Sequence, residues 1–309
     1  MEFIENFEVS CLGEQEIDVY DIEVEDNHNF FANDILVHNS VYVDFTRVLN
    51  KLKISDNKKY IDFVNTFNEK YLSLYLEENF VYFSKNLHGI DKNYFDLKRE
   101  VITIGSIFIQ KKKYALYVID EEGITLEKPK LKVKGIEIVR SSTPGYCRTK
   151  LKEVVEDIFI ENSLTKTTER VKLLKKDFEK QLISDIAFPR GVNDLEKYID
   201  KNGNAGKGCP IHVRAASIYN KLLVLHKLEN KYEKIRDGDK IKFIYIRADN
   251  PLKENIIGFK DELPKEFGFD KYIDYDLQFE KSFLSPIENI AKAMGWKFSL
   301  DTQDISDFF

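Results

Sequence analysis

Residues 38–40 of this 309-residue chain, His38-Asn39-Ser40, place an imidazole, a carboxamide and a hydroxyl next to one another. The side-chain nitrogen of an asparagine can attack its own main-chain carbonyl, which closes a succinimide and breaks the following peptide bond. That reaction is slow unless a neighbouring group polarises the carbonyl, and an imidazole can do so near neutral pH. The hydroxyl of Ser40 is a nucleophile that can accept an acyl group from an ester or a thioester. The tripeptide therefore has the residue types for peptide-bond cleavage coupled to acyl transfer.

Two segments upstream of the tripeptide contain further acidic and imidazole groups. Residues 17–24 alternate between apolar and polar side chains, which is typical of a β-strand, and they include Asp21. His28 follows a turn at residues 25–27, and residues 35–37 read as another strand after a second turn. This stretch is too short to bury a core of its own, so we expect it to need a partner.

Together these segments resemble the C-terminal motif of inteins, in which a Tyr-Asp strand, a His-Asn-Phe segment and a terminal His-Asn precede Ser, Thr or Cys. The resemblance implies that residues 1–39 are the C-terminal fragment of an all-β, Hint-type intein. It further implies that splicing takes place between Asn39 and Ser40, where the intein ends and the C-extein begins.

By the same resemblance, Asp21 and His28 support the acyl-transfer steps, His38 assists the cyclisation of Asn39, and Ser40 is the acceptor nucleophile. Splicing of this kind requires no metal ion or nucleotide. The 39 residues before the junction are far fewer than a whole intein needs. We therefore predict a split intein whose N-terminal half is a separate chain, so that splicing occurs in trans. A truncated piece of a contiguous precursor is the alternative.

The pattern of apolar residues after the junction changes several times. Residues 56–87 show the three- and four-residue spacing of a helix with one buried face. Strands are predicted at residues 101–109, 114–119, 130–139 and 241–246, and long helical segments follow Pro144. The order predicts an α+β unit over residues 40–140 and a mostly α-helical unit over residues 141–309.

Several segments of this downstream region point to one family when they are taken in order. They are Ser40-Val41-Tyr42-Val43-Asp44 (a hydroxyl before a predicted short strand), Lys111-Lys112-Lys113-Tyr114-Ala115-Leu116, Lys134 to Arg140, Ser141-Ser142-Thr143-Pro144 and Lys207 to Arg214. They resemble the C-terminal third of family B DNA polymerases of large tailed phages. The resemblance covers essentially all of residues 40–309. The Lys-Lys-Lys-Tyr segment matches the family's Lys-Lys-Arg-Tyr pattern except for lysine at position 113.

This second resemblance implies a multi-domain protein with the palm's C-terminal part in residues 40–140 and the thumb in residues 141–309. Ser40 would end the family's Asp-Thr-Asp-Ser motif, whose carboxylates hold two metal ions. Those carboxylates would then lie in the N-terminal partner, and the present chain would hold no metal ion and could not polymerise alone. The joined product would be a DNA-directed DNA polymerase that uses Mg²⁺, dNTPs and primer–template DNA.

The resemblance also suggests which side chains contact DNA. Lys111, Lys112, Lys113 and Tyr114 are predicted at a hairpin bend, where ammonium groups can meet phosphates, although a solvated turn is the alternative. Lys134, Arg140 and Arg214 are further predicted DNA contacts, His212 is a thumb residue or a packed histidine, and lysines 128, 130, 132 and 134 alternate along one strand face. Glu100 would support the palm near the metal ions, or form a surface ion pair.

The last ten residues, 300–309, contain an aliphatic residue, two spacers and two aromatics. Ile305, Phe308 and Phe309 fit the short peptides by which replicative polymerases bind a hydrophobic pocket of a sliding clamp. The glutamine common in one class of these peptides is absent, because Thr302 takes its place. An apolar chain end packed on the thumb is the alternative.

The composition of the chain excludes some further classes of protein. A net charge of −6 argues against a protein that coats nucleic acid through bulk charge, but it permits a local basic groove. The three cysteines have no metal-ligand spacing and suit a reducing compartment. With no secretory leader and no apolar run of membrane-spanning length, we expect a soluble, cytoplasmic protein without a membrane partner.

Two rival functions remain. One is a stand-alone protein that binds DNA or tethers a sliding clamp and keeps an inert intein remnant. The intact set of junction residues favours active splicing over it. The other is a hydrolase that uses Ser40 with His38, which we consider a poor fit.

Overall fold

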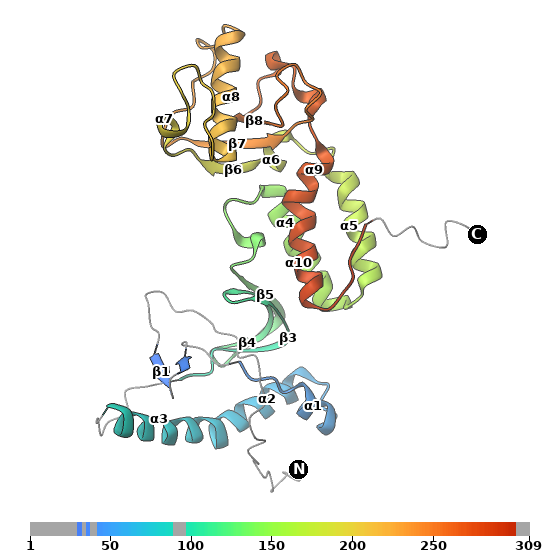
Figure 1. Ribbon diagram of the computed structural model, residues 1–309. Helices are drawn as coiled ribbons and strands as arrows, with labels where there is room; N and C mark the ends of the chain where they lie inside the picture. Colours follow the sequence, from blue (N-terminus) through green and yellow to red (C-terminus); the bar gives the residue numbers. More distant parts are fainter. Residues whose placement is uncertain (1–29, 33–34, 38–41, 89–96, 301–309) are drawn as a thin grey trace, which may run out of the picture. The chain divides into compact units, whose positions relative to one another are not determined.

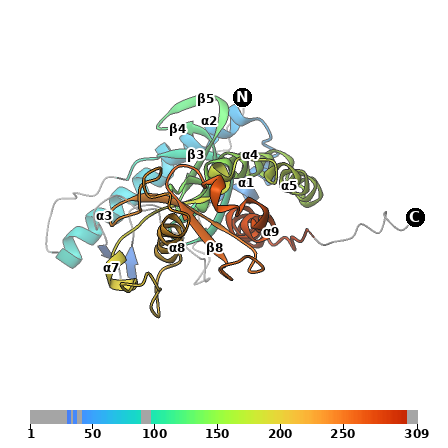
Figure 2. The ribbon, with the colours of Figure 1, turned by 90° about the horizontal axis from the view of Figure 1, so that it is seen from above.

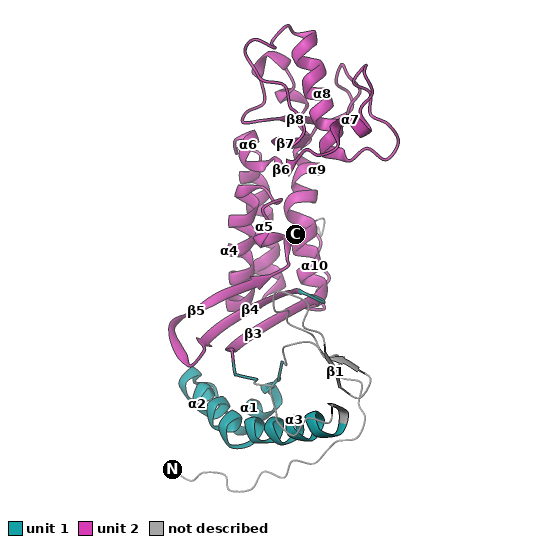
Figure 3. Ribbon diagram, turned by 90° about the vertical axis from the view of Figure 1, so that its left-hand side faces the viewer, with its two compact units in different colours: residues 1–99, 110–112 teal, residues 100–109, 113–309 magenta. Residues whose placement is uncertain are grey.

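The computed structural model describes residues 30–32, 35–37, 42–88 and 97–300. The chain divides into two compact units, coloured separately in Figure 3. Unit 1 comprises Met1–Arg99 with Gln110–Lys112, and unit 2 comprises Glu100–Ile109 with Lys113–Phe309. The predicted strand at residues 17–24 lies outside the described residues.

Unit 1 contains a short antiparallel strand pair. Strand β1 (Phe30–Ala32) pairs with β2 (Ile35–Val37), with Phe30 opposite Val37. The predicted strand at residues 35–37 is therefore confirmed. Residues 42–45, in contrast, form no strand, although the sequence predicts one immediately after Ser40. Alternating residues form a strand only where a neighbour satisfies their main-chain groups, and no described strand pairs with this segment.

Three helices make up most of the rest of the described part of unit 1. They are α1 (Thr46–Leu52), α2 (Asn57–Phe67) and α3 (Ser73–His88), with a π-helical turn, η1 (Asn68–Leu72), between the last two. Asp56 begins α2 by accepting a hydrogen bond from the main-chain nitrogen of Lys59 at 2.9 Å. The helix predicted over residues 56–87 is confirmed, with η1 interrupting the α-helical hydrogen bonds.

Unit 2 begins with an antiparallel sheet of order β3-β4-β5 (Figure 1). Its strands are β3 (Val101–Gln110), β4 (Lys113–Glu121) and β5 (Ile124–Lys134). The predicted hairpin is confirmed. The strand predicted at residues 130–139 is wrong at both ends, because β5 starts earlier and stops before Gly135, whose φ of 66° breaks the extended backbone. A 3₁₀ turn, η2 (Glu137–Val139), follows.

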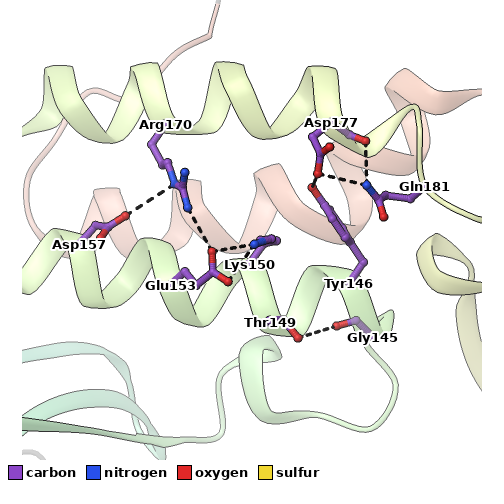
Figure 4. Close-up of polar contacts among 9 residues, drawn as sticks. All are labelled: Gly145, Tyr146, Thr149, Lys150, Glu153, Asp157, Arg170, Asp177 and Gln181. Carbon is purple, nitrogen blue, oxygen red and sulfur yellow. Dashed lines mark hydrogen bonds and ion pairs between the residues drawn. The ribbon is translucent and has the colours of Figure 1, made fainter.

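Two long helices come next, α4 (Gly145–Glu161) and α5 (Leu164–Phe178). They bury a shared apolar stripe and exchange polar contacts along their outer edge (Figure 4). Arg170 Nη2 on α5 donates to Glu153 Oε2 on α4 at 3.1 Å, and Tyr146 Oη donates to Asp177 Oδ2 at 2.8 Å. The end of α4 lies on the first sheet, since Phe159 stacks on Tyr117 of β4 with ring centroids 5.3 Å apart.

A second antiparallel sheet, of order β6-β7-β8, follows in the same unit. Its strands are β6 (Phe188–Gly191), β7 (Lys240–Tyr245) and β8 (Ile256–Phe259), and short helices α6 (Ile183–Ile186) and α7 (Leu195–Tyr198) flank β6. The sequence predicts only the strand at residues 241–246, so the mostly helical character predicted for residues 141–309 requires correction to mixed α and β. Strand β6 contains a proline and β8 is a run of four buried residues, and neither gives an alternating pattern.

Helix α8 (Ile211–Leu225) packs on this second sheet and lies beside β8 in two views (Figure 1, Figure 2). The contact is close because β8 contains a glycine. A Cβ atom at Gly258 would lie 2.8 Å from the carbonyl oxygen of Ala215. Any side chain at this position would therefore push the helix off the strand.

The chain then returns to α4 and α5. The returning elements are η3 (Lys265–Phe267), η4 (Asp270–Tyr272), α9 (Tyr275–Phe279), η5 (Glu280–Leu284) and α10 (Ser285–Ala293). Gln278 is fully buried, accepts from the main-chain nitrogen of Tyr245 at 3.1 Å and donates to the carbonyl of Ile186 at 2.5 Å. It thereby joins α9 to β7 and to the end of α6. Among the helices of the described ranges, none combines the length and apolar composition that crossing a bilayer requires.

Candidate nucleic-acid interface

The predicted splicing residues Asp21, His28, His38, Asn39 and Ser40 lie outside the described residues. The predicted clamp-binding residues Ile305, Phe308 and Phe309 lie outside them as well. Both groups stay predictions from sequence. The other predicted residues can be located, and most belong to two basic regions of unit 2.

The first basic region is the face of the first sheet that carries the lysine stripe of β5. Tyr114 on β4 is directly opposite Lys134 on β5, and Leu116 is opposite Lys132, so these side chains share one face. Tyr114 is only 3% exposed, and burial, followed by the nearby Glu100 carboxylate, raises the pKa of its hydroxyl. Tyr114 is thus mainly a packing residue in this structure, and the lysines lie around it.

Carboxylates neutralise much of this face. Lys132 Nζ lies 2.7 Å from Glu100 Oε1 and 3.3 Å from Glu121 Oε1, and Lys130 Nζ lies 3.4 Å from Glu121 Oε2. We call these four side chains the sheet cluster. Hydrogen bonding from Lys132 lowers the pKa of the Glu121 carboxyl. Burial opposes the charged form of Lys132, but its bonds to Glu100 and Glu121 outweigh this and raise its pKa. The structure therefore places Glu100 in an ion pair.

The Lys-Lys-Lys-Tyr segment forms the turn and the start of β4, as predicted. Lys111 and Lys112 are exposed, and Lys112 adopts a left-handed backbone with φ of 65°. Lys113 Nζ lies 3.4 Å from Glu137 Oε1 in η2. The same carboxylate oxygen is 3.8 Å from Arg140 Nη1, so Glu137 lies between two predicted DNA-contacting cations.

The segment that carries Arg140 is held in place by main-chain contacts. Thr143 is buried and its hydroxyl donates to the carbonyl of Glu137 at 2.6 Å. Arg140 Nε donates to the carbonyl of Gly135 at 3.2 Å. The Ser-Ser-Thr-Pro motif therefore has a structural role, because it helps to hold residues 137–143 in a compact turn.

The second basic region centres on Arg190 of β6, which the sequence analysis missed. Its Nη1 donates to the carbonyls of Ser142 at 2.7 Å and Pro189 at 3.0 Å. Burial lowers the pKa of Arg190, and the nearby charge of Arg140 lowers it further. No carboxylate of the described residues lies within ion-pair distance of Arg190. No local signal marks this arginine, because its partner Ser142 is 48 residues away in the chain.

His212, in the first turn of α8, completes this region. Its pKa is lowered from 6.5 by burial and then by the charge of Arg190. We call Arg140, Arg190 and His212 the cationic cluster. The helix end itself has no side-chain cap and no acidic residue in its first turn, so its main-chain N–H groups add positive potential. Such a cluster suits a phosphate-bearing ligand.

Arg214 does not join the cationic cluster. Two residues along a helix differ by about 200° in direction, so Arg214 and His212 face away from each other. Arg214 Nη2 donates instead to Asn255 Oδ1 at 2.6 Å. The structure thus places Arg140 and His212 each near Arg190, and Lys113 close to Arg140 through Glu137, but it directs Arg214 to Asn255.

We also looked for carboxylates that could hold catalytic metal ions among the described residues. Within the described ranges, no group of three or more His, Cys, Asp or Glu side chains is arranged to bind a metal ion. The residues present therefore do not fit a two-metal site, and we derive no step through a metal for them.

Comparison with known proteins identifies the family. The family model of DNA polymerase family B matches residues 85–294. The chain is 28% identical over 278 residues to the DNA-directed DNA polymerase of Enterobacteria phage T4, which covers 84% of this chain and 30% of that protein. It is 27% identical over 270 residues to the enzyme of Escherichia phage RB69, covering 82% and 29%.

An archaeal relative gives a longer match on this chain. The DNA polymerase of Thermococcus aggregans is 27% identical over 279 residues, which covers 90% of this chain and 13% of that protein. The chain thus spans less than a third of the length of each of these relatives. The family model covers well over half of this chain, and the family predicted from the sequence is confirmed: the chain belongs to DNA polymerase family B.

Proposed function

We propose that this chain supplies the C-terminal palm and thumb of a DNA-directed DNA polymerase, and that protein trans-splicing at Asn39–Ser40 joins it to an N-terminal half. In this proposal residues 40–140 complete the palm and residues 141–309 form the thumb. Membership of family B supports the polymerase part. The cationic cluster is the observation that carries DNA binding, because it places Arg140 and the neighbouring His212 near a half-buried arginine that no described carboxylate neutralises.

The intein part rests on the residues at the junction, and one comparison supports it. The match to the Thermococcus aggregans polymerase covers 90% of this chain, more than residues 40–309 can account for. That match therefore includes part of residues 1–39. A family relative that aligns with residues before Ser40 is expected if the segment is an inserted element found at the same place in other polymerases.

The proposed splicing reaction has three steps that balance without a cofactor. The Ser40 hydroxyl attacks the acyl group that the N-terminal half carries as an ester or thioester, and the released thiol or alcohol takes the proton. The side-chain nitrogen of Asn39 then attacks its own carbonyl, with assistance from His38, which frees residues 1–39 as a succinimide. Finally the exposed amine of Ser40 attacks the ester it carries, and a peptide bond replaces it. Asp21 and His28 assist the acyl transfers.

The polymerase active site is proposed to be completed by the partner. The polymerase portion of the partner would end in Asp-Thr-Asp, so that Ser40 finishes the metal-binding motif after splicing, and its carboxylates would hold the Mg²⁺ ions. Glu100 is proposed to lie near them, where its pair with Lys132 would orient it. The substrates are dNTPs and primer–template DNA.

The proposed duplex contacts combine the predicted residues with one found in the structure. The predicted ones are Lys111, Lys112, Lys113, Tyr114, Lys134, Arg140 and Arg214, and Arg190 is added to them. Their role is to bind phosphates of the primer–template duplex. The tail at residues 300–309, through Ile305, Phe308 and Phe309, is proposed to bind a sliding clamp.

The experiment that tests the proposal is mass spectrometry of this chain mixed with its N-terminal partner, beside an Asn39→Ala control. We expect a ligated product that runs through Ser40 and a released fragment of residues 1–39 that ends in a succinimide. The control should give neither the succinimide nor the ligated peptide. An unligated wild-type mixture under reducing conditions would refute splicing by this chain.

A second function follows if splicing fails: a stand-alone protein that binds duplex DNA or tethers a clamp and retains an inert intein remnant. The cationic cluster favours this reading as much as the first. A genomic observation separates the two. Splicing requires a reading frame that encodes the rest of the polymerase and ends in Asp-Thr-Asp followed by an intein N-terminal fragment, whereas the stand-alone protein requires none.

A further inference from the structure

A tight turn between α7 and α8 contains the pair Asn202-Gly203. Ile199 and Ala205 form an antiparallel bridge across this turn, and the main-chain nitrogen of Asp200 donates to the carbonyl of Asn204 at 3.0 Å. No other asparagine of the sequence is followed by glycine. We call residues 199–205 the Asn-Gly turn.

Asparagine followed by glycine is prone to cyclise, because glycine has no side chain to obstruct attack by its main-chain nitrogen. The Gly203 nitrogen attacks the side-chain carbonyl carbon of Asn202. A new C–N bond forms, the carboxamide C–N bond breaks, and ammonia leaves with the proton of the Gly203 nitrogen. Water then opens the succinimide. Its attack on the side-chain carbonyl gives aspartate, and its attack on the main-chain carbonyl gives isoaspartate, in which the backbone runs through the side chain.

The fold itself favours glycine at position 203. The φ of Gly203 is 77°, in the left-handed region that glycine adopts without steric cost. Asn202 is exposed, so water reaches its side chain. The backbone conformation of the Asn-Gly turn therefore places a reactive pair at the protein surface.

Asp200 holds the reacting nitrogen in place. The Gly203 nitrogen donates to the carbonyl of Asp200 at 2.8 Å. Oδ1 of Asp200 accepts from the main-chain nitrogens of Asn202 at 2.9 Å and of Asn204 at 2.7 Å. The bond from the Asn204 nitrogen is the main cause that lowers the pKa of Asp200, so the carboxylate is ionised and a strong acceptor at neutral pH. Cyclisation requires the Gly203 nitrogen to leave this arrangement.

The Asn-Gly turn is also bonded to α8, the helix that carries His212. The Ser217 hydroxyl donates to the carbonyl of Gly203 at 2.7 Å, and Lys221 Nζ donates to Asn204 Oδ1 at 2.9 Å. These contacts flank position 202 on its C-terminal side, while Asp200 lies on its N-terminal side. A change of backbone length at position 202 therefore disturbs both sets of bonds.

We propose that Asn202 is a site of spontaneous deamidation and that Asp200 restrains its rate. Conversion to isoaspartate adds one carbon to the backbone at the centre of the Asn-Gly turn. The bonds from Asp200 to residues 202 and 204 then no longer fit together, and the turn loosens from α8. Neither splicing nor DNA binding takes part in this reaction, so the inference is independent of the proposed function.

Peptide mapping of the full chain by mass spectrometry, after incubation at mildly alkaline pH, tests the site. Deamidation raises the mass of the peptide that holds Asn202 by about 1 Da. Fragmentation should locate the change at Asn202, whereas Asn204, exposed in the same turn but followed by alanine, should stay unmodified. The chain unfolded in urea at the same pH should react at least about fivefold faster at Asn202, because the restraint is lost. Unmodified Asn202 in both samples would refute the site, and equal rates would refute the restraint.

Variants of Asp200 test its role. Asp200→Ala should raise the rate at Asn202 about fivefold, the effect of losing one ordinary hydrogen bond. Asp200→Asn keeps an oxygen that accepts from the same nitrogens, so its rate should lie between those of the wild type and Asp200→Ala. Asp274→Ala is the matched control, since Asp274 Oδ1 also accepts from a main-chain nitrogen, that of Leu277 at 2.9 Å at the start of α9. This control should not change the rate at Asn202.

Equal acceleration by Asp200→Ala and Asp274→Ala would show that a general loss of stability controls the reaction, and would overturn the restraint by Asp200. An unchanged rate in Asp200→Ala would overturn it as well. Hydrogen exchange provides the readout for loosening. The amides of residues 199–205 should exchange faster in the purified isoaspartate form than in the unmodified chain. Identical exchange in the two forms would refute the loosening of the turn from α8.

Discussion

Lys132 on β5 and Arg190 on β6 are basic residues of the same unit with different surroundings. Lys132 Nζ is 2.7 Å from Glu100 and 3.3 Å from Glu121, so the protein itself matches its charge. Arg190 donates to the carbonyls of Ser142 and Pro189 and faces Arg140. Within the part of the chain that the structure describes, no carboxylate matches its charge.

The two residues therefore differ in whether their positive charge is paired within the protein or can bind an anion. A partly buried lysine paired with two glutamates, such as Lys132, has little charge left for a ligand. A half-buried arginine beside another cation is held in an unfavourable field, and an anion that binds there relieves it. The cationic cluster should therefore dominate phosphate binding, and the sheet cluster should contribute less. The following predictions test whether the cationic cluster contributes more to phosphate binding than the sheet cluster.

Replacing Arg190 should have the largest effect. Arg190→Met keeps the length of the side chain but removes its charge, and we expect duplex DNA affinity to fall about tenfold or more, with the salt slope reduced by about one. Fluorescence anisotropy with a labelled primer–template duplex across a salt series measures both. The loss of the bonds to Ser142 and Pro189 should also cost about 1–3 kcal/mol of stability.

The matched control for this variant is Arg170→Met. Arg170 pairs with Glu153 at 3.1 Å and with Asp157 at 3.7 Å on the outer edge of α4 and α5. Its charge is matched internally, so duplex affinity should not change. Equal losses for the two arginine variants would show that overall charge, and not the cationic cluster, governs binding.

The carboxylate between the two regions should act in the opposite direction. Glu137 lies 3.4 Å from Lys113 and 3.8 Å from Arg140, where it competes with phosphate for both cations. Glu137→Gln should therefore raise duplex affinity, by about two- to fivefold. Glu153→Gln on α4 is the control and should leave affinity unchanged. A loss of affinity in Glu137→Gln would mean that this carboxylate positions Arg140 for the ligand.

Removing the central lysine of the sheet cluster should have a smaller effect. Lys132→Met should lower stability by no more than about 1 kcal/mol, since both of its glutamate partners are at least partly exposed to solvent. Duplex affinity should fall about twofold at most. A double-mutant cycle with Glu100→Gln, read by chemical denaturation, should give a coupling energy of about 0.2–1 kcal/mol. A loss of affinity as large as that of Arg190→Met would contradict the prediction that the cationic cluster contributes more to phosphate binding than the sheet cluster.

The elements that sequence predicts well are those with a local signal. The hairpin of β3 and β4 has alternating apolar residues on both sides of a lysine turn, and α2, η1 and α3 have a sustained helical spacing. Strands β6 and β8 have neither. Phe188-Pro189-Arg190-Gly191 becomes a strand only because β7 pairs with it some fifty residues later. Such pairing is decided by the tertiary fold, and no short window contains it.

The same distinction applies to the site. The lysines at the turn and Arg140 stand out in the sequence, but the ion pairs of the sheet cluster join residues up to 32 positions apart. Arg190 acquires its significance from Ser142, which is 48 positions away. Arg214, predicted as a DNA contact, is directed to Asn255 because the helix turns it away from His212. The sequence identifies the basic residues. The fold decides which of them are paired within the protein and which can bind a phosphate.

The smallest predicted effect is a pH dependence that reports on the field at Arg190. Burial and the charge of Arg190 hold the pKa of His212 below its ordinary value of 6.5, while the unfolded chain keeps the ordinary value. Between the two values the unfolded chain binds a proton that the folded chain does not. The stability linked to His212 is therefore fully present above pH 6.5 and falls as the pH drops through that value.

Melting temperatures of the wild type and of His212→Gln, measured between about pH 7.5 and pH 5.5, should therefore diverge toward low pH, with the wild type losing more. Arg190→Met should reduce the divergence, because it removes one cause of the lowered pKa. A phosphate bound at the cluster offsets the charge of Arg190 and favours the imidazolium, so the duplex affinity of the wild type should rise more steeply on acidification than that of His212→Gln. Parallel curves for the two proteins, both in melting and in binding, would mean that His212 does not sense Arg190 and that the cationic cluster is reduced to its two arginines.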